Sequence, residues 1–254
     1  MTASVMVSDA DGVRTISLCR PDRLNAINLD MIERVESALA DAQKDDKVRV
    51  LLLRGSGRAF CAGDDVEAQT AISNQGEQAL RDQLRKLQSI SELLVLGTKP
   101  SLAAVQGWAV GAGFSWAINC DFQLWATGAC GFFPEVGYGS FVTGGATHLL
   151  PRLVGPAYAN QLLFQALRVT SGAALEHGLA HGVHPEIELD GRAAALVREL
   201  AQLPPRAAMA MKQALGGPIS APFRAALAEE IEQCVVTTLD PGTLARMRSA
   251  AGKG

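Results

Sequence analysis

Residues 99–113 have the sequence KPSLAAVQGWAVGAG, and this stretch decides the fold. Its opening Lys-Pro pair stops a preceding helix, and the apolar run Ser101 to Val105 predicts a short buried strand. Gln106-Gly107 predicts a turn, and the glycines of Gly111-Ala112-Gly113 lie where the next helix, through Asn119, begins. The stretch therefore predicts a strand, a glycine loop and a helix in direct succession.

The same unit occurs once more upstream. Val48 to Arg54 predicts a buried strand, and Gly55 to Arg58 predicts a turn. The segment Phe60 to Val66, which contains Gly63, then leads into a polar helical stretch around Glu77 to Leu94. Two glycine loops thus follow two buried strands, and each loop precedes a helix.

The remaining segments surround these two units. Val13 to Leu18 and Phe122 to Ala126 predict two more strands, and Asn28 is a typical N-cap for the helix that follows it. Gly131 to Gly145 predicts a loop that carries functional groups. From Ala146 onward we expect helices without further strands, with breaks at Pro151, Pro156, Gly178 and Pro204-Pro205 and a last amphipathic stretch from Ala221 to Thr238. This division predicts a layered α/β core with a helical tail, whose apolar stripes a partner subunit can cover.

The composition fits one domain that binds a small molecule. The chain has 254 residues, of which 48% are hydrophobic and 19% charged, and this is enough to bury a sizeable core. A net charge of -3 and a pI of about 5.8 argue against nucleic acid or a membrane surface as partner, since both need a concentrated basic face. No apolar run is long enough for a membrane span and no signal peptide is evident, so we expect a cytoplasmic protein.

Cysteines and histidines give no indication of a metal site. The five cysteines are scattered without C-x-x-C spacing, which favours buried free thiols over a disulfide framework or a zinc site. His177, His181 and His184 have a spacing that would place two of them on one helix face, but Gly178 and Gly182 would end that helix early. We therefore predict no metal.

The two glycine loops place unpaired backbone N–H groups where they can face a ligand. If the N–H groups of Asp64 and Ala112 converge on one carbonyl oxygen, they form an oxyanion hole, with each donor contributing about 3 kcal/mol in a transition state. Spacing alone favours ordinary strand-to-helix turns, because glycine turns are common. The motifs around the loops are more specific.

Nearly the whole chain resembles the enoyl-CoA hydratase/isomerase (crotonase) family. Segments similar to the family's motifs follow one another in the family's order: Arg20 to Ile27, Arg58 to Val66, Lys99 to Gly113, Cys120-Asp121, Phe133 to Gly137, Gly144-Gly145, Leu153 to Gly155 and Ala174 to Leu179. The resemblance implies an α/β fold, the ClpP/crotonase spiral of ββα units with a C-terminal helical region. We expect residues 1–190 to form the spiral core with the acyl-CoA site, and residues 191–254 to pack subunits into a homotrimer or hexamer.

The resemblance also assigns roles to individual residues. Asp64 and Ala112 fall where the family has its two oxyanion-hole amides, and Ala112 replaces the usual glycine. An N–H donor survives that change where the backbone conformation is accessible to alanine. The expected substrate is an acyl-CoA thioester, with no permanently bound cofactor. The residues expected to bind it are Arg23, Leu24, Ala62, Asp65 and Val66, which match positions along the CoA path, together with Gly111 and Tyr138.

The supply of carboxylates decides which reaction is expected. The hydratases of the family have one glutamate after the G-G-G segment and a second after the F-x-x-P segment. Glu135 matches the second, whereas Ser115 occupies the place of the first and cannot act as a comparable base without an activating partner. The pattern resembles the Δ3-Δ2 enoyl-CoA isomerases, in which one carboxylate moves a proton from C2 to C4. Burial of Glu135 among aromatic residues would raise its pKa and suit this role.

Two alternatives remain open at this point. Ser115 can hold a water for a slow enoyl-CoA hydratase in which Glu135 makes all the proton transfers. The chain can also be a non-catalytic binder of long-chain acyl-CoA, given the lost glutamate and the aromatic loop from Phe132 to Phe141. A serine hydrolase built on Gly113 to Ala117 is a weaker alternative, because no histidine lies in a triad-like context.

Two side chains near these motifs have no assigned direction. The carboxylate of Asp64 either points to solvent or repels a developing enolate, and sequence does not distinguish these cases. His148 follows the glycine-rich loop and either reaches the acyl pocket or lies on a helix surface.

Overall fold

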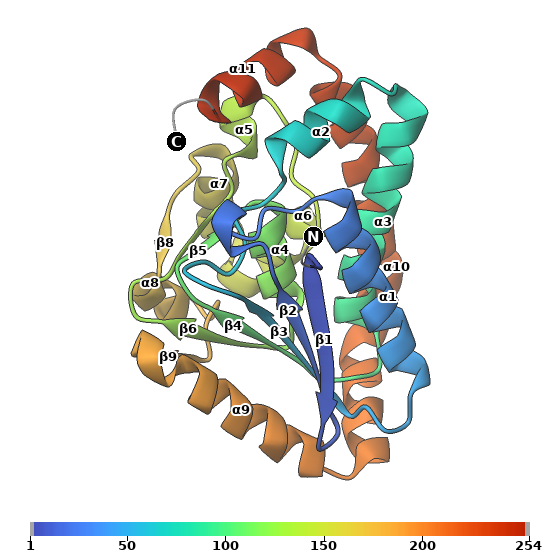
Figure 1. Cartoon of the computed structure of the whole chain (residues 1–254), viewed down its shortest axis with the longest axis vertical. Helices are drawn as coiled ribbons and strands as arrows, with labels where there is room; N and C mark the ends of the chain where they lie inside the picture. The colour runs from blue at the N-terminus through green and yellow to red at the C-terminus, as the bar shows by residue number, and fades with distance from the viewer. Residues whose placement is uncertain (1–2, 252–254) are drawn as a thin grey trace.

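A computed structural model of the chain describes residues 3–251 (Figure 1). Its main sheet has six strands in the order β1-β2-β3-β4-β6-β9. β1 runs antiparallel to β2 and all other neighbours are parallel. The strands are β1 (Val5–Ala10), β2 (Val13–Leu18), β3 (Val50–Gly55), β4 (Ser101–Val105), β6 (Phe122–Ala126) and β9 (Gly182–His184). β3 and β4 lie at the centre because nearly continuous apolar runs suit a parallel strand that is covered on both faces.

A second, smaller sheet follows β4 directly. It consists of β5 (Trp108–Val110), β7 (Cys130–Phe132) and β8 (Val169–Thr170), with β5 and β7 parallel and β8 antiparallel to β7. A single bridge between Cys61 and Ala109 connects the loop after β3 to β5. Both glycine loops are therefore attached to the small sheet.

Helices cover the sheets on several sides. α9 packs against β2, β3, β4, β6 and β9, while α3 packs between α1 and α10 on the opposite flank (Figure 1). The helices are η1 (Pro21–Arg23), α1 (Leu29–Lys44), α2 (Val66–Ser73), α3 (Glu77–Leu96), α4 (Ala112–Asn119), α5 (Glu135–Tyr138), α6 (Ala146–Val154), α7 (Pro156–Phe164), α8 (Ser171–Glu176), α9 (Glu186–Gln202), α10 (Pro205–Thr238) and α11 (Pro241–Ala251).

Three of the predicted strands have the expected bounds, namely Val13–Leu18, Ser101–Val105 and Phe122–Ala126. The helix cap at Asn28 is also confirmed, because its Oδ1 accepts a hydrogen bond of 3.0 Å from the N–H of Met31. Local patterns were sufficient here, since a continuous apolar run and a capping residue both act within a few positions.

The expectation that no strand follows Ala146 was wrong. β8 and β9 lie within the helical half, and β9 pairs with β6 at the edge of the main sheet. Two or three residues are too few for an alternating pattern, so only tertiary pairing reveals such strands.

Two of the expectations about helix breaks also need correction. Pro151 lies inside α6, where the burial of Leu149 and Leu150 outweighs the loss of one backbone hydrogen bond. α10 begins at Pro205, as the Pro204-Pro205 break predicts. The expected last helix from Ala221 to Thr238 is not separate, because α10 continues through Pro218 to Thr238.

The boundary proposed at residue 190 falls within α9, a helix that packs on the main sheet. Residues 1–2 and 252–254 of the two proposed segments lie outside the described residues. No helix within residues 3–251 is long and apolar enough to cross a membrane.

Candidate active site

The two glycine loops lie directly against each other. A Cβ atom on Gly63, whose φ is +83°, would lie 2.7 Å from the carbonyl oxygen of Val110, and a Cβ atom on Gly113 would lie 2.6 Å from that of Cys61. Cys61 N–H donates to Trp108 O at 3.0 Å, and Val110 N–H donates to Cys61 O at 2.9 Å. Only glycine permits backbone segments to approach this closely.

Each loop carries one backbone donor that the protein leaves free. Within residues 3–251, the N–H groups of Asp64 and Ala112 have no hydrogen-bond acceptor, whereas the adjacent Asp65 N–H donates to Ile27 O and Gly111 N–H donates to Phe132 O, both at 3.0 Å. Ala112 is the first residue of α4, so its N–H belongs to the positive end of the helix. The positive φ of +52° is carried by Gly111, and Ala112 keeps a conformation open to alanine.

The Glu135 carboxyl group lies beside these donors. Glu135 is the first residue of α5, and a Cβ atom on Gly111 would lie 2.5 Å from its Oε1. Its Oε2 atom is buried and has no hydrogen-bond partner among the described residues. Burial raises the pKa of Glu135 to about 8, and the carboxylates of Asp64 and Glu230 contribute to the rise.

The Asp64 side chain is only partly exposed to solvent. Asp64 is partly buried, and burial raises its pKa to about 6, with a further contribution from the Asp65 carboxylate. Its charge in turn helps to raise the pKa of Glu135 and of the Cys234 thiol on α10, although burial is the main cause in both groups. The Asp64 carboxylate is therefore close enough to Glu135 to raise its pKa.

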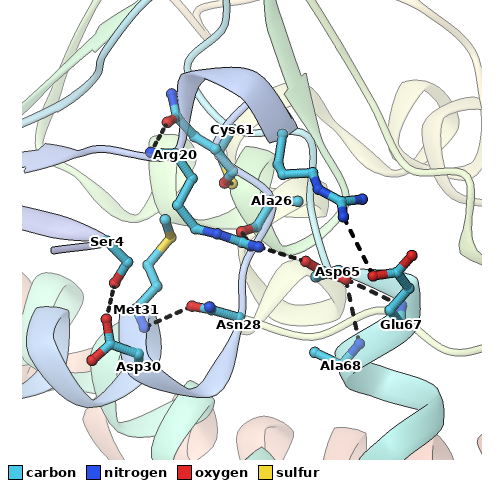
Figure 2. A network of polar contacts seen from close by, with 12 residues as sticks. Ser4, Arg20, Ala26, Asn28, Asp30, Met31, Cys61, Asp65, Glu67 and Ala68 are labelled. Carbon is cyan, nitrogen blue, oxygen red and sulfur yellow. Dashed lines mark hydrogen bonds and ion pairs between the residues drawn. The ribbon is translucent and has the colours of Figure 1, made fainter. Parts of the chain in front are cut away.

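The neighbouring Asp65 has a structural role. Its Oδ1 accepts hydrogen bonds from the N–H groups of Glu67 and Ala68 at 3.1 and 3.3 Å, and so caps α2. Its Oδ2 forms a 2.9 Å ion pair with Arg20 Nη2 (Figure 2). Two consecutive aspartates thus have opposite environments, one with every oxygen engaged and one facing the site.

Ser115 lies behind the site, within α4. Its side chain is buried, with 1% of the residue exposed, and its hydroxyl group donates a 2.7 Å hydrogen bond to the carbonyl oxygen of Thr143. Gly144 packs against the Cβ of Ser115. The hydroxyl proton is therefore committed to holding the loop that follows α5.

Known proteins that are similar to the chain identify its family. The sequence profile of enoyl-CoA hydratase/isomerase matches residues 8–239. The short-chain-enoyl-CoA hydratase of Clostridium acetobutylicum is 30% identical over 230 residues, which are 90% of this chain and 87% of that protein. The chain belongs to the enoyl-CoA hydratase/isomerase family. Proteins of this family act on acyl-CoA thioesters.

Two further matches describe the extent of the likeness. The chain is 32% identical over 180 residues to the peroxisomal fatty acid beta-oxidation multifunctional protein of Oryza sativa, covering 71% of this chain but only 24% of that longer protein. A crystal structure of an enoyl-CoA hydratase/isomerase from Xanthobacter autotrophicus has a TM-score of 0.89 and 26% identity, covering 100% of this chain and 95% of that one. The predicted crotonase fold is confirmed.

The residues expected along the CoA path of this family member lie together at one edge. Ala62 N–H donates to Leu24 O at 2.9 Å, and Arg23 Nη2 approaches Glu67 Oε2 at 3.5 Å on the surface. Val66 begins α2 directly after Asp65. Tyr138 is set apart from this group, at the end of α5, where its carbonyl oxygen accepts a 2.7 Å hydrogen bond from Arg246 Nε on α11.

Sequence reasoning missed Glu230, a buried carboxylate near the site. Its Oε2 accepts from Gln88 Nε2 at 2.9 Å and Gly145 N–H at 2.8 Å, and its Oε1 accepts from the N–H and hydroxyl of Thr147 at 3.0 and 2.7 Å. A signal was available, because Glu230 falls on the buried stripe of α10 at helical spacing from Leu227 and Cys234.

The histidines are separated from the site and from one another. His177 stacks on Tyr158 with ring centroids 3.8 Å apart, and His181 Nδ1 accepts from Gln123 N–H at 3.2 Å. His148 is buried against Phe223 of α10, and burial lowers its pKa. Within the described part of the chain, no three acidic, histidine or cysteine side chains are grouped to hold a metal ion.

Proposed function

We propose that the chain is an enoyl-CoA isomerase that moves a Δ3 double bond to the Δ2 position. Glu135 removes a proton from C2, and the electrons of that C–H bond pass into a dienolate whose oxygen is bound by the N–H groups of Asp64 and Ala112. A proton then arrives at C4 and the C2=C3 double bond remains. The reaction needs no oxidant, metal or water.

The observation that carries this proposal is the environment of Glu135. Its carboxyl group is buried against Gly111, which directly precedes one of the two free donors, and its Oε2 atom has no protein partner in residues 3–251. A buried carboxyl with a pKa of about 8 holds a proton weakly enough to exchange it with carbon near neutral pH.

Substrate binding is part of the same proposal. Arg23, Leu24, Ala62, Asp65 and Val66 are proposed to bind the CoA portion, with Gly111 and Tyr138 near the acyl group. Arg23 is exposed enough to meet a phosphate, and Leu24 and Ala62 are held together by their backbone hydrogen bond. CoA arrives with the substrate, and we propose no permanently bound cofactor.

The test replaces Glu135 by glutamine, which keeps the shape of the side chain and removes its acid–base function. Glu135→Gln should abolish turnover of a 3-enoyl-CoA while leaving the Kd for a CoA thioester nearly unchanged. Glu186→Gln, at an exposed carboxylate of α9, is the matched control and should keep full activity. Unchanged turnover in Glu135→Gln would rule out Glu135 as the base.

Hydration is the second candidate, because the relative from Clostridium acetobutylicum is named a short-chain-enoyl-CoA hydratase. In this case Ser115 would hold the water, yet its hydroxyl proton is already donated to Thr143. The isomerase proposal therefore expects slow hydration of crotonyl-CoA, little affected by Ser115→Ala and increased by Ser115→Glu. Fast native hydration that Ser115→Ala removes would support the hydratase instead.

A silent acyl-CoA binder is the third possibility from the sequence, and the same assays decide it. Tight binding of long-chain acyl-CoA without turnover of any enoyl-CoA would support the binder and remove both enzyme proposals. We also propose a homotrimer or hexamer, since Met211 and Leu215 of α10 are 64% and 73% exposed one turn apart. Light scattering coupled to gel filtration measures this directly.

A further inference from the structure

We propose that the Asp64 side chain is a second proton-transfer group, and that it works as a pair with Glu135. This inference rests on the enoyl-CoA isomerase proposed above and refines its first step: Asp64 takes the proton from C2, and Glu135 supplies the proton at C4. The carboxylate missing at Ser115 is thereby replaced from the other glycine loop.

Backbone contacts bring the loop that carries Asp64 against Gly111, which the Glu135 carboxyl group also contacts. A Cβ atom on Gly63 would lie 2.7 Å from Val110 O and 3.9 Å from Gly111 Cα, so the residue before Asp64 touches the residue before Ala112. The Glu135 carboxyl group also lies against Gly111. Asp64 and Glu135 are thus both close to the residue that precedes the second free donor.

Neither carboxyl group of the pair has a protein partner that would fix its charge. Among residues 3–251, Asp64 accepts no side-chain or backbone hydrogen bond and neither Asp64 nor Glu135 forms an ion pair. Asp65 and Glu230, in contrast, have both oxygens engaged. For the buried Oε2 atom of Glu135, the lack of a partner is costly unless the atom meets a ligand.

The charged and titratable groups that face the pair are acidic. Asp65 lies beside Asp64 and is paired with Arg20, while Glu230 and the Cys234 thiol approach from α10. These neighbours and burial together separate the two titrations, with the pKa of Asp64 at about 6 and that of Glu135 at about 8. Between these pH values the pair holds one proton, which resides mainly on Glu135.

This protonation state suits the isomerisation better than Glu135 alone. At pH 7 a lone carboxyl group with a pKa near 8 is mostly protonated, so only about a tenth of the molecules can start by accepting a proton. Asp64 is ionised at that pH, and its backbone N–H binds the thioester oxygen, so its carboxylate begins close to C2.

One turnover moves two protons. Asp64 takes the proton from C2, the C–H electron pair forms the dienolate, and Glu135 gives its own proton to C4 as the double bond shifts. The negative charge leaves Asp64 as it develops on the thioester oxygen, so the total charge of the site does not increase. Asp64 then releases its proton to water and Glu135 takes a new proton from water, which restores the starting state.

Isotope transfer distinguishes this pair from a single carboxylate. A single base that takes deuterium from C2 of a 2,2-dideuterated 3-enoyl-CoA returns the same deuterium to C4. With the pair, C4 receives the proton that Glu135 took from water, so the native enzyme should place little substrate deuterium at C4. Asp64→Asn should retain more of that deuterium at C4 and lower kcat/KM at pH 7 by roughly 100-fold.

The pH profile provides a second readout. The native profile of kcat/KM should be bell-shaped, with limbs near pH 6 and pH 8, and Asp64→Asn should leave a single limb that rises with pH. Asp64→Ala should behave in the same way, whereas Asp46→Asn, at an exposed aspartate remote from the site, should leave both readouts unchanged. Identical deuterium retention and pH profiles in native enzyme and Asp64→Asn would overturn the pair.

A titration that needs no turnover separates this inference from the proposed function. The infrared carboxyl band of Glu135, assigned by its loss in Glu135→Gln, should disappear at a lower pH in Asp64→Asn than in the native protein. An unchanged Glu135 titration would refute the pair even if no enoyl-CoA is turned over. Absence of 3-enoyl-CoA turnover with a shifted titration would refute the isomerase and support the carboxyl pair.

Discussion

The Oε2 atom of Glu230 accepts a hydrogen bond of 2.8 Å from the N–H of Gly145, the N-cap residue of α6. The contact joins the last long helix of the chain to the loop that follows α5, and Gln88 of α3 joins the same loop by accepting from Gly144 N–H at 2.7 Å. The positive end of α6 compensates part of the cost of burying the Glu230 carboxylate. The segment behind Glu135 is thus held by a group from a distant part of the sequence.

Replacing Glu230 by glutamine should destabilise the protein. Each oxygen of Glu230 accepts two hydrogen bonds, so the amide NH2 of glutamine would face two donors and leave them unpaired in a buried position, at a cost of about 2 kcal/mol. Urea unfolding of Glu230→Gln measures the loss. The exposed neighbour Glu229, whose Oε1 accepts only from Gln233, is the control. Equal unfolding midpoints for Glu230→Gln and Glu229→Gln would contradict this account.

Glu135 should make the folded protein less stable as pH rises. Its folded-state pKa of about 8 lies above the unfolded value of 4.5, so the folded state binds more protons between these pH values. The free energy of unfolding therefore falls as the pH rises from about 4.5 to about 8. The stabilising contribution of Glu135 is fully present only below pH 4.5. Glu135→Gln removes the effect and should be more stable than the native protein at pH 9 by roughly 5 kcal/mol, since each pKa unit of the difference corresponds to about 1.4 kcal/mol.

The measurement for Glu135 is denaturant unfolding at pH 5 and pH 9. The difference between Glu135→Gln and native protein should be small at pH 5 and large at pH 9, whereas Glu186→Gln should follow the native protein at both. A stability difference that does not change with pH would show that the carboxyl group is not held in its protonated form by burial.

Much of the fold could be predicted because its signals are local. The strand Ser101–Val105 and the cap at Asn28 are specified within a few residues, and both agree with the structure. The two loops approach each other closely at Gly63, Gly111 and Gly113. The sequence predicts two glycine turns but not the contact between them. The short strand Gly182–His184 was missed because its pairing with β6 is a tertiary event.

The sequence predicts those parts of the candidate site that lie within the family's motifs. The backbone donors and Glu135 follow from the family pattern, and their roles are still to be tested. The raised pKa of Asp64 depends on its burial and on the neighbouring Asp65 carboxylate, and burial is a property of the folded chain. Glu230 acts 85 residues away from Gly145 in sequence, and no local pattern links them. Side-chain burial and long-range contacts were therefore beyond sequence reasoning.

Gly111 should tolerate no side chain, for two independent reasons. Its φ of +52° is costly for an alanine, by about 1–2 kcal/mol, and the new Cβ atom would lie 2.5 Å from Glu135 Oε1. Gly111→Ala should therefore displace the Glu135 carboxyl group, lower the melting temperature and reduce turnover of a 3-enoyl-CoA. Gly191→Ala is the matched control, because Gly191 lies inside α9 with no atom within 4 Å of its added Cβ. It should be neutral or slightly stabilising, since alanine favours a helix. Full activity in Gly111→Ala would mean that the position of the Glu135 carboxyl group does not matter for turnover, and the proton-transfer role of Glu135 would fall with it.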